Sequence, residues 1–315
     1  MRYLRLIPDD TKLRFMTYRW IAFPVSITAM IASLVLFAIL GLNLGIDFKG
    51  GSLIEIRTID GPADIGAIRS SLGELNLGDV QVQEFGAPDD VLIRIEDQEG
   101  GEAAQQRAVT LIRGTLGEEG VEYRRVEVVG PRVSGELAEA GTIAVVVALF
   151  AVLLYIWFRF EWQFALGAVA ATIHDVVLTI GMFSVLRLDF TLASIAAILT
   201  IVGYSLNDTV VVYDRVRENL RRYKKMPLPQ LLDLSINNTL SRTVLTSLTT
   251  LLALFALFIF GGEVIRSFVF AMIWGIFVGT YSSIFIAAPL LIHLKLKRGG
   301  SKDGGAETAE TAEAT

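Results

Sequence analysis

Two acidic residues and one arginine interrupt stretches of the chain that are otherwise apolar and long enough to cross a membrane. They are Asp175, Asp208 and Arg242, which fall in the stretches 162–186, 190–213 and 241–260. A charged side chain at the centre of the membrane costs about 2.5–3.5 kcal/mol, so it normally faces the inside of a helix bundle and has a partner. Such ionisable groups predict that the chain moves protons or ions. His174, beside Asp175, is a further candidate for handling a proton.

Polar residues on the same segments form stripes. Residues three, four or seven positions apart share one face of a helix. The stripes comprise Thr172, Asp175 and Thr179; Thr200, Tyr204, Ser205 and Asp208, with Gly203 and Asn207 alongside; and Arg242, Thr246, Thr249 and Ala253. Small residues on these segments would let the helix backbones approach closely. We expect the stripes to face one another as a polar path, with Asp208 and Arg242 at similar depths in the membrane.

Structural roles compete with these interpretations. Serine and threonine in membrane helices often bond back to their own helix. Arg242 begins its segment and can be an anchor at the membrane surface, and Asp208 lies near the end of its segment, where water can solvate it. His174 can equally be a histidine of the packed core. Asp175 lies nearer the middle of its segment and is harder to explain in this way.

The composition is that of a membrane protein. Hydrophobic residues make up 53% of the 315 residues and charged residues only 19%, a balance that ordinary soluble domains do not show. A hydrocarbon core of about 30 Å needs about 20 helical residues. The segments that are long enough are 20–42, 140–158, 162–186, 190–213, 241–260 and 268–292. The predicted organisation is an N-terminal segment (1–19), the first helix, a polar domain (43–139), five further helices, and a tail (293–315).

Lysine and arginine gather at one end of the predicted helices. They are frequent in 1–19, in 215–225 and in 295–298, whereas the two short loops at the other end hold one each, Arg187 and Arg266. By the positive-inside rule, both termini are cytoplasmic and the domain 43–139 lies outside. Residues 299–315 are mainly Gly, Ala, Glu and Thr, so we expect the tail to be disordered.

The polar domain is acidic and has a readable pattern. Between residues 47 and 136 it has 18 acidic and 9 basic residues, which argues against nucleic acid as a partner. Alternation predicts strands at 52–58, 80–85, 91–95 and 121–129, with a turn at 86–90, and helical spacing predicts helices at 62–75 and 102–116. The order βαββαβ is the ferredoxin-like plan. The predicted fold is therefore an all-α six-helix transmembrane bundle with an external α+β domain inserted between its first two helices.

No pattern in the sequence supports soluble-enzyme chemistry. The phosphate-binding motif G-x-x-x-x-G-K-[ST] and the nucleophile elbow G-x-S-x-G are both absent. Two histidines and no cysteine leave little for a transition-metal site. We expect no enzyme activity, cofactor or metal, and work driven by an ion gradient or a partner.

Several blocks of sequence, in order, resemble the SecD/SecF protein-export family. Asp47-Phe48-Lys49-Gly50-Gly51 is similar to the family's D-F-x-G-G signature, and His174-Asp175-Val176 to a motif of the third helix. Residues 203–212, continuing through 214–219, are similar to the fourth-helix signature, and 241–243 and 279–285 match further blocks. Together they run from about residue 40 to residue 292. The fourth-helix block is highly specific, whereas D-F-x-G-G alone would be weak.

The resemblance implies a role in protein export. Such a chain would work with SecD beside the Sec channel and its subunits, in the bacterial cytoplasmic (inner) membrane, with its outer domain in the periplasm. In the family, two six-helix halves face each other, as in resistance-nodulation-division transporters, and couple the proton-motive force to late steps in the export of preproteins. Asp208 and Arg242 match positions tied to proton passage, and Asp175 lies in the third-helix motif.

The expected mechanism is a bundle that alternates between states in which Asp208 and Arg242 are paired and unpaired. Each charge moved through the field contributes about 2.3 kcal/mol per 100 mV. Movement would reach the outer domain through the segment with Asp47, Phe48, Gly50 and Gly51, whose glycines permit unusual backbone angles. Two alternatives are half of a proton-driven exporter of small molecules or lipids, and a passive membrane scaffold that displays the outer domain.

Overall fold

The computed structural model describes residues 11–117, 120–294 and 296. Within these residues six helices are long and apolar enough to cross a membrane: Phe15–Leu40, Arg132–Arg159, Trp162–Leu186, Leu192–Arg222, Leu228–Phe260 and Arg266–His293. The predicted six-helix membrane architecture is confirmed. Residues 1–10, in the predicted N-terminal segment, and 297–315, in the predicted disordered tail, lie outside the described residues.

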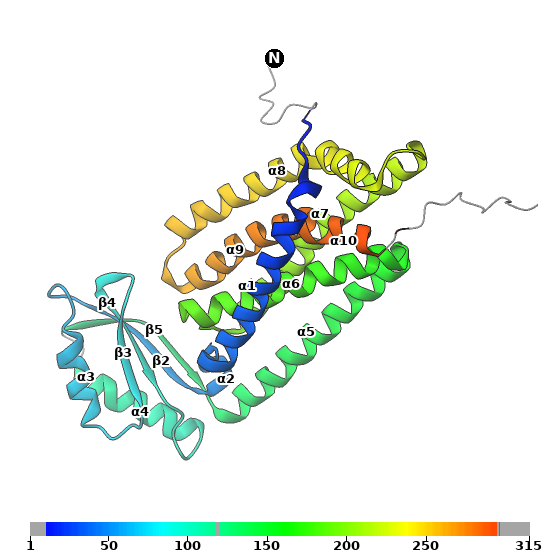
Figure 1. Ribbon diagram of the computed structural model, residues 1–315. Helices are drawn as coiled ribbons and strands as arrows, with labels where there is room; N and C mark the ends of the chain where they lie inside the picture. Colours follow the sequence, from blue (N-terminus) through cyan, green and yellow to red (C-terminus); the bar gives the residue numbers. More distant parts are fainter. Residues whose placement is uncertain (1–10, 118–119, 295, 297–315) are drawn as a thin grey trace, which may run out of the picture.

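Three helices form the centre of the bundle and the others surround them (Figure 1). The bundle consists of α1 (Arg19–Leu40), α5 (Pro131–Arg159), α6 (Trp162–Leu186), α7 (Leu192–Arg222), α8 (Leu228–Phe260), α9 (Arg266–Ser282) and α10 (Ala288–His293), with the short turns η1 (Phe15–Tyr18), η2 (Glu263–Ile265) and the π-helical η3 (Ser283–Ala287). The share of residues buried in the apolar part of each span separates inner from outer helices. It is 50% for α6, 50% for α7 and 67% for α9 with α10, but only 6% for α1 and 11% for α5. Polar side chains between α6, α7 and α9 are therefore shielded from lipid.

Three helices are longer than their apolar segments predict. α5 begins at Pro131 instead of residue 140, α7 continues to Arg222 instead of ending at 213, and α8 begins at Leu228 instead of 241. Apolar length reports only the part of a helix inside lipid, because backbone hydrogen bonds continue where the helix enters water. The basic residues expected in a loop at 215–222 therefore lie on α7, and the last strand of the polar domain ends at Val129.

The polar domain is an α+β unit with the predicted order of elements. It consists of β2 (Gly51–Thr58), α3 (Ile65–Gly73), β3 (Val80–Phe85), β4 (Ala87–Ile95), α4 (Glu102–Leu116) and β5 (Val121–Val129). The strands form one antiparallel sheet in the order β3-β4-β2-β5. Helices α3 and α4 lie on the side of the sheet away from the bundle (Figure 1). The core between helices and sheet includes the fully buried residues Ile54, Ile56, Leu72, Ile93 and Ile112.

The turn predicted at residues 86–90 is much shorter in the structure. Phe85 pairs with Ala87, and Gly86 alone makes the turn with φ of 88°, a conformation that glycine adopts without a steric cost. β4 therefore begins at Ala87, and Asp90 lies in the sheet opposite Arg57. Arg57 binds both carboxylate oxygens of Asp90, at 2.7 and 2.6 Å, so a stretch that is typical of a turn is held in the strand by an ion pair.

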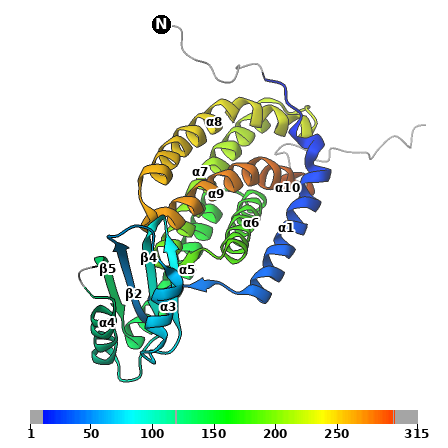
Figure 2. The same cartoon turned by 90° about the vertical axis from the view of Figure 1, so that its left-hand side faces the viewer.

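The α+β domain stands on one end of the bundle, where the connections of the chain meet (Figure 2). After α1 the chain forms β1 (Asn43–Leu44), which pairs in parallel with β6 (Asp189–Phe190) between α6 and α7. A short helix, α2 (Ile46–Lys49), then leads into β2. Arg94 of β4 also binds Asp189, at 2.6 Å. The sequence does not predict these contacts, since β1 and β6 are only two residues long.

Glycines on α6 and α9 bring the central helices close together. A Cβ at Gly275 would lie 2.2 Å from Cγ1 of Ile201, and one at Gly279 would lie 2.9 Å from Cβ of Ser205. On α6, a Cβ at Gly167 would lie 2.1 Å from the hydroxyl oxygen of Tyr213. As expected for small residues in membrane helices, they allow the backbones to approach, and they set the positions of the side chains described next.

Candidate functional site

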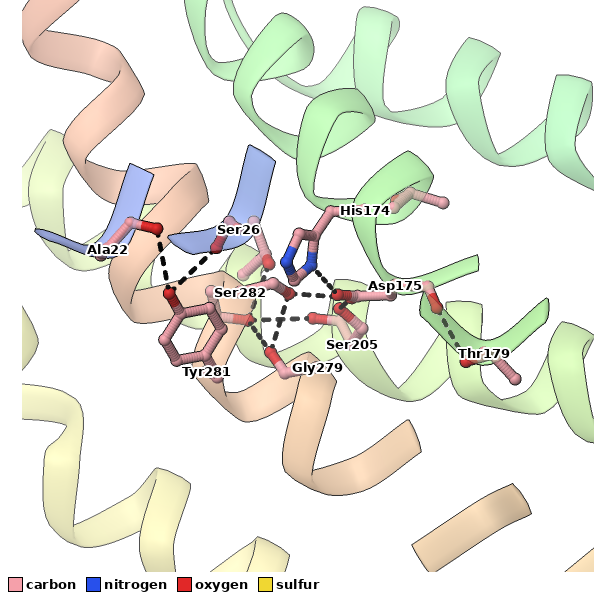
Figure 3. Close-up of polar contacts among 12 residues, drawn as sticks. Ala22, Ser26, His174, Asp175, Thr179, Ser205, Gly279, Tyr281 and Ser282 are labelled. Atoms are coloured by element: carbon pink, nitrogen blue, oxygen red, sulfur yellow. Dashed lines mark hydrogen bonds and ion pairs between the residues drawn. The ribbon is translucent and has the colours of Figure 1, made fainter. Parts of the chain in front are cut away.

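Asp175 lies at the centre of the bundle and binds groups from three helices (Figure 3). It is fully buried. Its Oδ1 lies 2.9 Å from Nδ1 of His174, and its Oδ2 accepts hydrogen bonds from Ser205 on α7, at 2.5 Å, and from Ser282 on α9, at 2.8 Å. Both oxygens of this carboxylate therefore have partners, which holds α6, α7 and α9 together at one level.

His174 and Tyr281 extend this cluster toward α1. The imidazole of His174 is buried, and its Nε2 has no hydrogen-bond partner in the part of the chain that the structure describes. Its ring centre lies 5.9 Å from that of Tyr281. The hydroxyl of Tyr281 lies 2.9 Å from Oγ of Ser26 and donates to the carbonyl of Ala22 at 3.3 Å (Figure 3). His174 is thus a core histidine whose Nδ1 lies beside Asp175 and whose Nε2 is buried without a hydrogen-bond partner among the described residues.

A second set of hydroxyl groups lies one turn further along α7. Oγ1 of Thr209 lies 2.9 Å from Oγ of Ser283, and Ser283 lies 3.4 Å from the carbonyl of Ser205. Ser283 begins the π-helical turn η3, and such turns inside α-helices occur frequently at functional sites. A row of hydroxyl groups thus continues along α7 from Asp175 to the residue next to Asp208.

Asp208 has a less complete environment than Asp175. It is 8% exposed, and its Oδ1 accepts a hydrogen bond from Thr243 of α8 at 2.5 Å. Its Oδ2 is buried and has no hydrogen-bond partner among the residues described, and the hydroxyl of Ser283 and the charge of Arg242 both act on the carboxylate group from nearby. An unpartnered carboxylate oxygen in a bundle core is costly, so the position of Asp208 is the one that the packing explains least.

Arg242 does not pair with Asp208. Thr243 faces α7, and the side chain of Arg242, one residue earlier on α8, is exposed. In the described part of the chain no ion pair joins the arginine to the carboxylate. Consecutive helical residues point about 100° apart, so only one of the two can face α7 in this arrangement. The paired state expected from the sequence is therefore absent from this conformation.

The remaining residues of the predicted path are divided between two faces. Ser205 is buried against Asp175, and Tyr204 has a buried hydroxyl with no partner in the described chain. Asn207 and Thr246 are exposed, and Thr246 donates to the carbonyl of Arg242 in its own helix. The stripes on α7 and α8 therefore do not converge on one interior path. Part of each faces outward.

The segment at the entry to the α+β domain adopts the backbone angles that its glycines permit. Gly50 and Gly51 have φ of 73° and 112°. A Cβ at Gly51 would lie 2.3 Å from the carbonyl oxygen of Ile95, so the position accepts no side chain. Asp47 accepts a hydrogen bond from the backbone N–H of Leu192, and the ring of Phe48 lies 5.8 Å from that of Phe190.

The sequence interpretation missed the residues that complete the site. They are Ser26, Thr209, Thr243, Tyr281, Ser282 and Ser283. Residues 279–285 and 241–243 stand out as motifs in the sequence, so a signal exists. Serine and threonine are ordinary in membrane helices, however, and only the packing shows which hydroxyl groups meet a carboxylate.

Comparison with known proteins shows the family to which the chain belongs. Residues 112–297 match the family described as protein export membrane protein SecD/SecF, C-terminal, and residues 35–58 match the SecD/SecF GG motif. The chain belongs to the SecD/SecF family. The two matches include Asp175, Asp208 and Arg242 in the first and Asp47 to Gly51 in the second.

Relatives in the SecD/SecF family have two chain lengths. The protein translocase subunit SecF of Rhodobacter capsulatus is 47% identical over 95% of this chain and 94% of its own. The protein translocase subunit SecDF of Brucella abortus is 49% identical over 99% of this chain, which spans only 41% of that relative. The crystal structure of SecDF from Thermus thermophilus, described as a translocon-associated membrane protein, matches 92% of this chain with a TM-score of 0.81 and 35% identity. The chain covers 39% of that structure.

Proposed function

We propose that this chain uses a proton gradient to drive the export of unfolded preproteins, as one half of a membrane unit whose other half is SecD. Membership of the family makes it a multi-pass membrane subunit of the Sec protein-translocation machinery. The proposal adds the energy source, the residues that exchange protons, and the partners, which are SecD, the Sec channel and the exported chain.

The proposed orientation follows from the positions of the basic residues. Three helix ends lie away from the α+β domain (Figure 1). They are the start of α1, the end of α7 with the basic residues 215–222, and the end of α10. Arg159, at the end of α5, lies at the same end and pairs with Asp214. With the positive-inside rule, this end faces the cytoplasm of a bacterium and the α+β domain faces the periplasm.

Asp208 is the observation that carries the proposal. Its side chain is buried in the bundle, one oxygen accepts a hydrogen bond from Thr243, and the other is buried without a hydrogen-bond donor in the described part of the chain. The energetic cost of that arrangement depends on whether the carboxyl group holds a proton. Uptake and release of a proton at Asp208 would therefore shift the balance between two arrangements of the bundle.

Arg242 supplies a second arrangement. It neighbours Thr243 on α8, and the two side chains point in directions about 100° apart. A rotation of α8 about its axis would exchange Thr243 for Arg242 beside Asp208. The unprotonated carboxylate would favour the arginine and the protonated group the threonine, because an opposite charge stabilises the ionised form. Alternation between these states would link proton passage to helix movement.

Asp175 and its hydroxyl partners have a positioning role in this scheme. Ser205, Thr209 and Ser283 can each donate and accept a hydrogen bond. Ser205 and Thr209 lie on α7, and Ser283 of η3 contacts both of them. His174, with its free Nε2, lies on the other side of Asp175. These groups can relay a proton from Asp208 deeper into the bundle.

An exposed stripe of small and polar residues supports the proposal that a second helix bundle packs against this one in the membrane. One exposed stripe along α7 and α8 consists of small or polar residues, whereas other faces of α8 expose large apolar residues such as Leu252 and Phe260. The stripe comprises Ala196, Thr200, Gly203 and Asn207 on α7, and Arg242, Thr246, Thr249 and Ala253 on α8. Small residues and hydroxyl groups are typical of helix–helix contacts in membranes and unusual toward lipid. Because the SecDF relatives are more than twice as long as this chain, we infer that SecD covers this stripe.

The test is replacement of Asp208 by asparagine, which keeps the acceptor for Thr243 but cannot ionise. Asp214→Asn is the matched control, since Asp214 lies on the same helix but is half-exposed and paired with Arg159. In membrane vesicles with SecD, we expect Asp208→Asn to abolish the part of preprotein export that depends on the gradient and Asp214→Asn to leave it intact. Unchanged gradient-dependent export in Asp208→Asn would remove the proton role. If the double variant Asp208→Asn with Arg242→Gln also exports normally but unfolds more readily, the scaffold alternative holds.

A further inference from the structure

The segment 43–51 connects the α+β domain to the first turn of α7. β1 pairs with β6 just before α7, and the N–H of Gly45 donates to the carbonyl of Phe190 at 2.9 Å. Two residues later, Oδ2 of Asp47 accepts a hydrogen bond from the N–H of Leu192 at 2.9 Å. The side chain of Asp47 is thus bonded across a gap of 145 residues to the first residue of α7.

Asp47 completes the cap of α7. Thr191 and Ser194 form a capping box, in which the N–H of Thr191 donates to Oγ of Ser194 at 3.0 Å. The capping box leaves the N–H of Leu192 without a partner inside the helix, and such groups must be satisfied elsewhere. A carboxylate is the favoured acceptor, because the amino end of a helix carries partial positive charge. Asp47 is therefore fixed to α7 by charge and by hydrogen bonding.

The same connection reaches Asp208 in one direction and the sheet in the other. Leu192 and Asp208 lie on one unbroken helix, about 24 Å apart at 1.5 Å per residue. On the other side, β2 begins at Gly51, where the backbone lies so close to Ile95 of β4 that a Cβ does not fit. The ring of Phe48 contacts Phe190 as well. A displacement of the outer end of α7 is therefore passed to Asp47 and on to β2 and β4.

Two cavities border the segment 43–51, which connects the bundle to the α+β domain. A cavity of about 470 Å³ and another of about 440 Å³ are both lined by Gly45 and Ile46. The second lies between the bundle and the sheet face that carries Leu53 and Leu92. The space between the domain and the bundle is thus not fully packed. Besides the segment 43–51, the ion pair between Arg94 and Asp189 and the direct continuation of β5 into α5 join the two parts.

We propose that Asp47 couples the proton-dependent movement of α7 to the α+β domain, by holding the amino end of that helix through its cap. It is a positioning residue, since it would act through its hydrogen bond to the first residue of α7. The inference rests on the proposed function and adds one requirement to it: the rotation of α8 that exchanges Thr243 for Arg242 must also shift α7, the helix that carries Asp208.

The test compares three variants in vesicles that contain SecD and the Sec channel. Asp47→Ala removes the cap, Asp47→Asn keeps a neutral capping oxygen, and Asp64→Ala is the matched control, because Asp64 caps α3 through the N–H of Ala67 at 2.9 Å within the α+β domain. Loss of a cap shifts a conformational equilibrium by about fivefold. We expect gradient-dependent export to fall about fivefold in Asp47→Ala and to stay near the original level in Asp47→Asn and Asp64→Ala. Normal export by Asp47→Ala, or a defect in Asp47→Asn equal to that in Asp47→Ala, overturns the inference.

A second measurement reads the coupling itself. Hydrogen exchange is followed in residues 43–58 of the purified complex, with and without Asp208→Asn. We expect Asp208→Asn to change exchange in this segment, and the change to disappear when Asp47→Ala is also present, a result that a purely structural cap would not produce. If Asp208→Asn changes exchange nowhere in 43–58, the inference is overturned without any substitution at residue 47. If Asp208→Asn leaves export itself unchanged, the proposed function fails first, so the two failures are distinguishable.

Discussion

Asp175 and Asp208 lie in the same bundle but have different hydrogen-bond environments. Asp175 has partners for both oxygens, from His174, Ser205 and Ser282. Within residues 11–117, 120–294 and 296, Asp208 accepts a hydrogen bond from Thr243 at one oxygen and has no hydrogen-bond donor at the other, which is buried. A saturated carboxylate holds its neighbours in place, whereas a half-saturated one can change partners at low cost. We therefore assign the structural part to Asp175 and the exchange of protons to Asp208.

This difference predicts opposite effects on stability. Asp175→Asn retains one acceptor oxygen and places an NH₂ group among donors, so it should destabilise the protein by about 1–3 kcal/mol. Asp208→Asn keeps the acceptor for Thr243 and removes a buried charge, so the protein should be as stable as before or more stable. Thermal unfolding of both variants in mild detergent, with Asp214→Asn alongside, measures the contrast. Equal loss of stability in Asp175→Asn and Asp208→Asn would contradict the division of roles.

At the scale of elements, close contact between α7 and α9 positions the site. Gly275 lies against Ile201, and Gly279 against Ser205, whose hydroxyl binds Asp175. Since α9 ends where the π-helical turn η3 begins, this contact also fixes Ser282 and Ser283. Helix approach and hydrogen bonding to Asp175 are thus set by the same pair of helices.

Replacing Gly275 by alanine tests that contact. The new Cβ would lie 2.2 Å from Ile201, and overpacking of this kind costs about 1–3 kcal/mol. Gly203→Ala is the matched control, since Gly203 lies on α7 with nothing within 4 Å of the added Cβ, and alanine should stabilise that helix by about 0.5–1 kcal/mol. Thermal unfolding in detergent should move in opposite directions for the two variants. A neutral Gly275→Ala would show that the helices are less tightly packed.

The ion pair in the sheet predicts a pH dependence of the α+β domain. The hydrogen bonds from Arg57 hold the pKa of Asp90 below its usual value. A lowered folded-state pKa adds stability above the unfolded-state value of about 4, and that stability is lost as pH falls through the lowered pKa. Hydrogen exchange in β2 and β4, corrected for the intrinsic rate at each pH, should therefore rise below about pH 4. Asp90→Asn should exchange faster at neutral pH and respond less to acid. An identical acid response in the variant would exclude Asp90 as its source.

The elements themselves could be predicted from the sequence to different degrees. α6, α4 and β5 begin and end where apolar spacing places them, because their ends coincide with turns and membrane borders. α8 begins well before its apolar stretch, since helical hydrogen bonding does not depend on lipid. The pairing of β1 with β6 joins residues 146 positions apart and consists of two residue pairs, too few to leave a periodic signal.

The site is predictable in its carboxylates but not in their partners. Asp175 and Asp208 stand out because a charge in an apolar segment is costly. Thr243 and Ser282 are common residue types, so nothing in the sequence distinguishes them from hydroxyl groups that bond only to their own helix. Arg242 shows the limit most clearly, because spacing places it at the level of Asp208 while rotation about the helix axis decides which residue faces α7.

At the scale of the whole molecule, the bundle has an incomplete surface. One exposed stripe along α7 and α8 is small or polar, although other faces of α8 expose large apolar residues such as Leu252 and Phe260. The exposed face of α1 is large and apolar, including Ile27, Ile31 and Ile39. α1 thus has a surface suited to lipid, and the small or polar stripe of α7 and α8 is a surface suited to another protein. The matched relatives that carry SecD in the same chain extend well beyond this half.

This asymmetry predicts which substitutions disturb assembly with SecD. Gly203→Trp adds a large side chain to the exposed stripe of α7 and should reduce co-purification with SecD severalfold, because close helix contacts need small residues. Ile31→Trp adds similar bulk to the exposed face of α1 and should leave assembly unchanged. Thermal unfolding of each variant alone checks that neither is misfolded. Loss of SecD from Ile31→Trp, with retention by Gly203→Trp, would place the partner on the opposite face.

The central claim, that Asp208 takes up and releases a proton, can be measured by infrared difference spectroscopy of the complex with SecD. Lowering the pH on the outer side should produce a carboxylic acid C=O band in the original protein and in Asp214→Asn, and Asp208→Asn should lack that band. If the band is unchanged in Asp208→Asn, or if none arises in the original protein while export still depends on the gradient, another group carries the proton and the account is wrong.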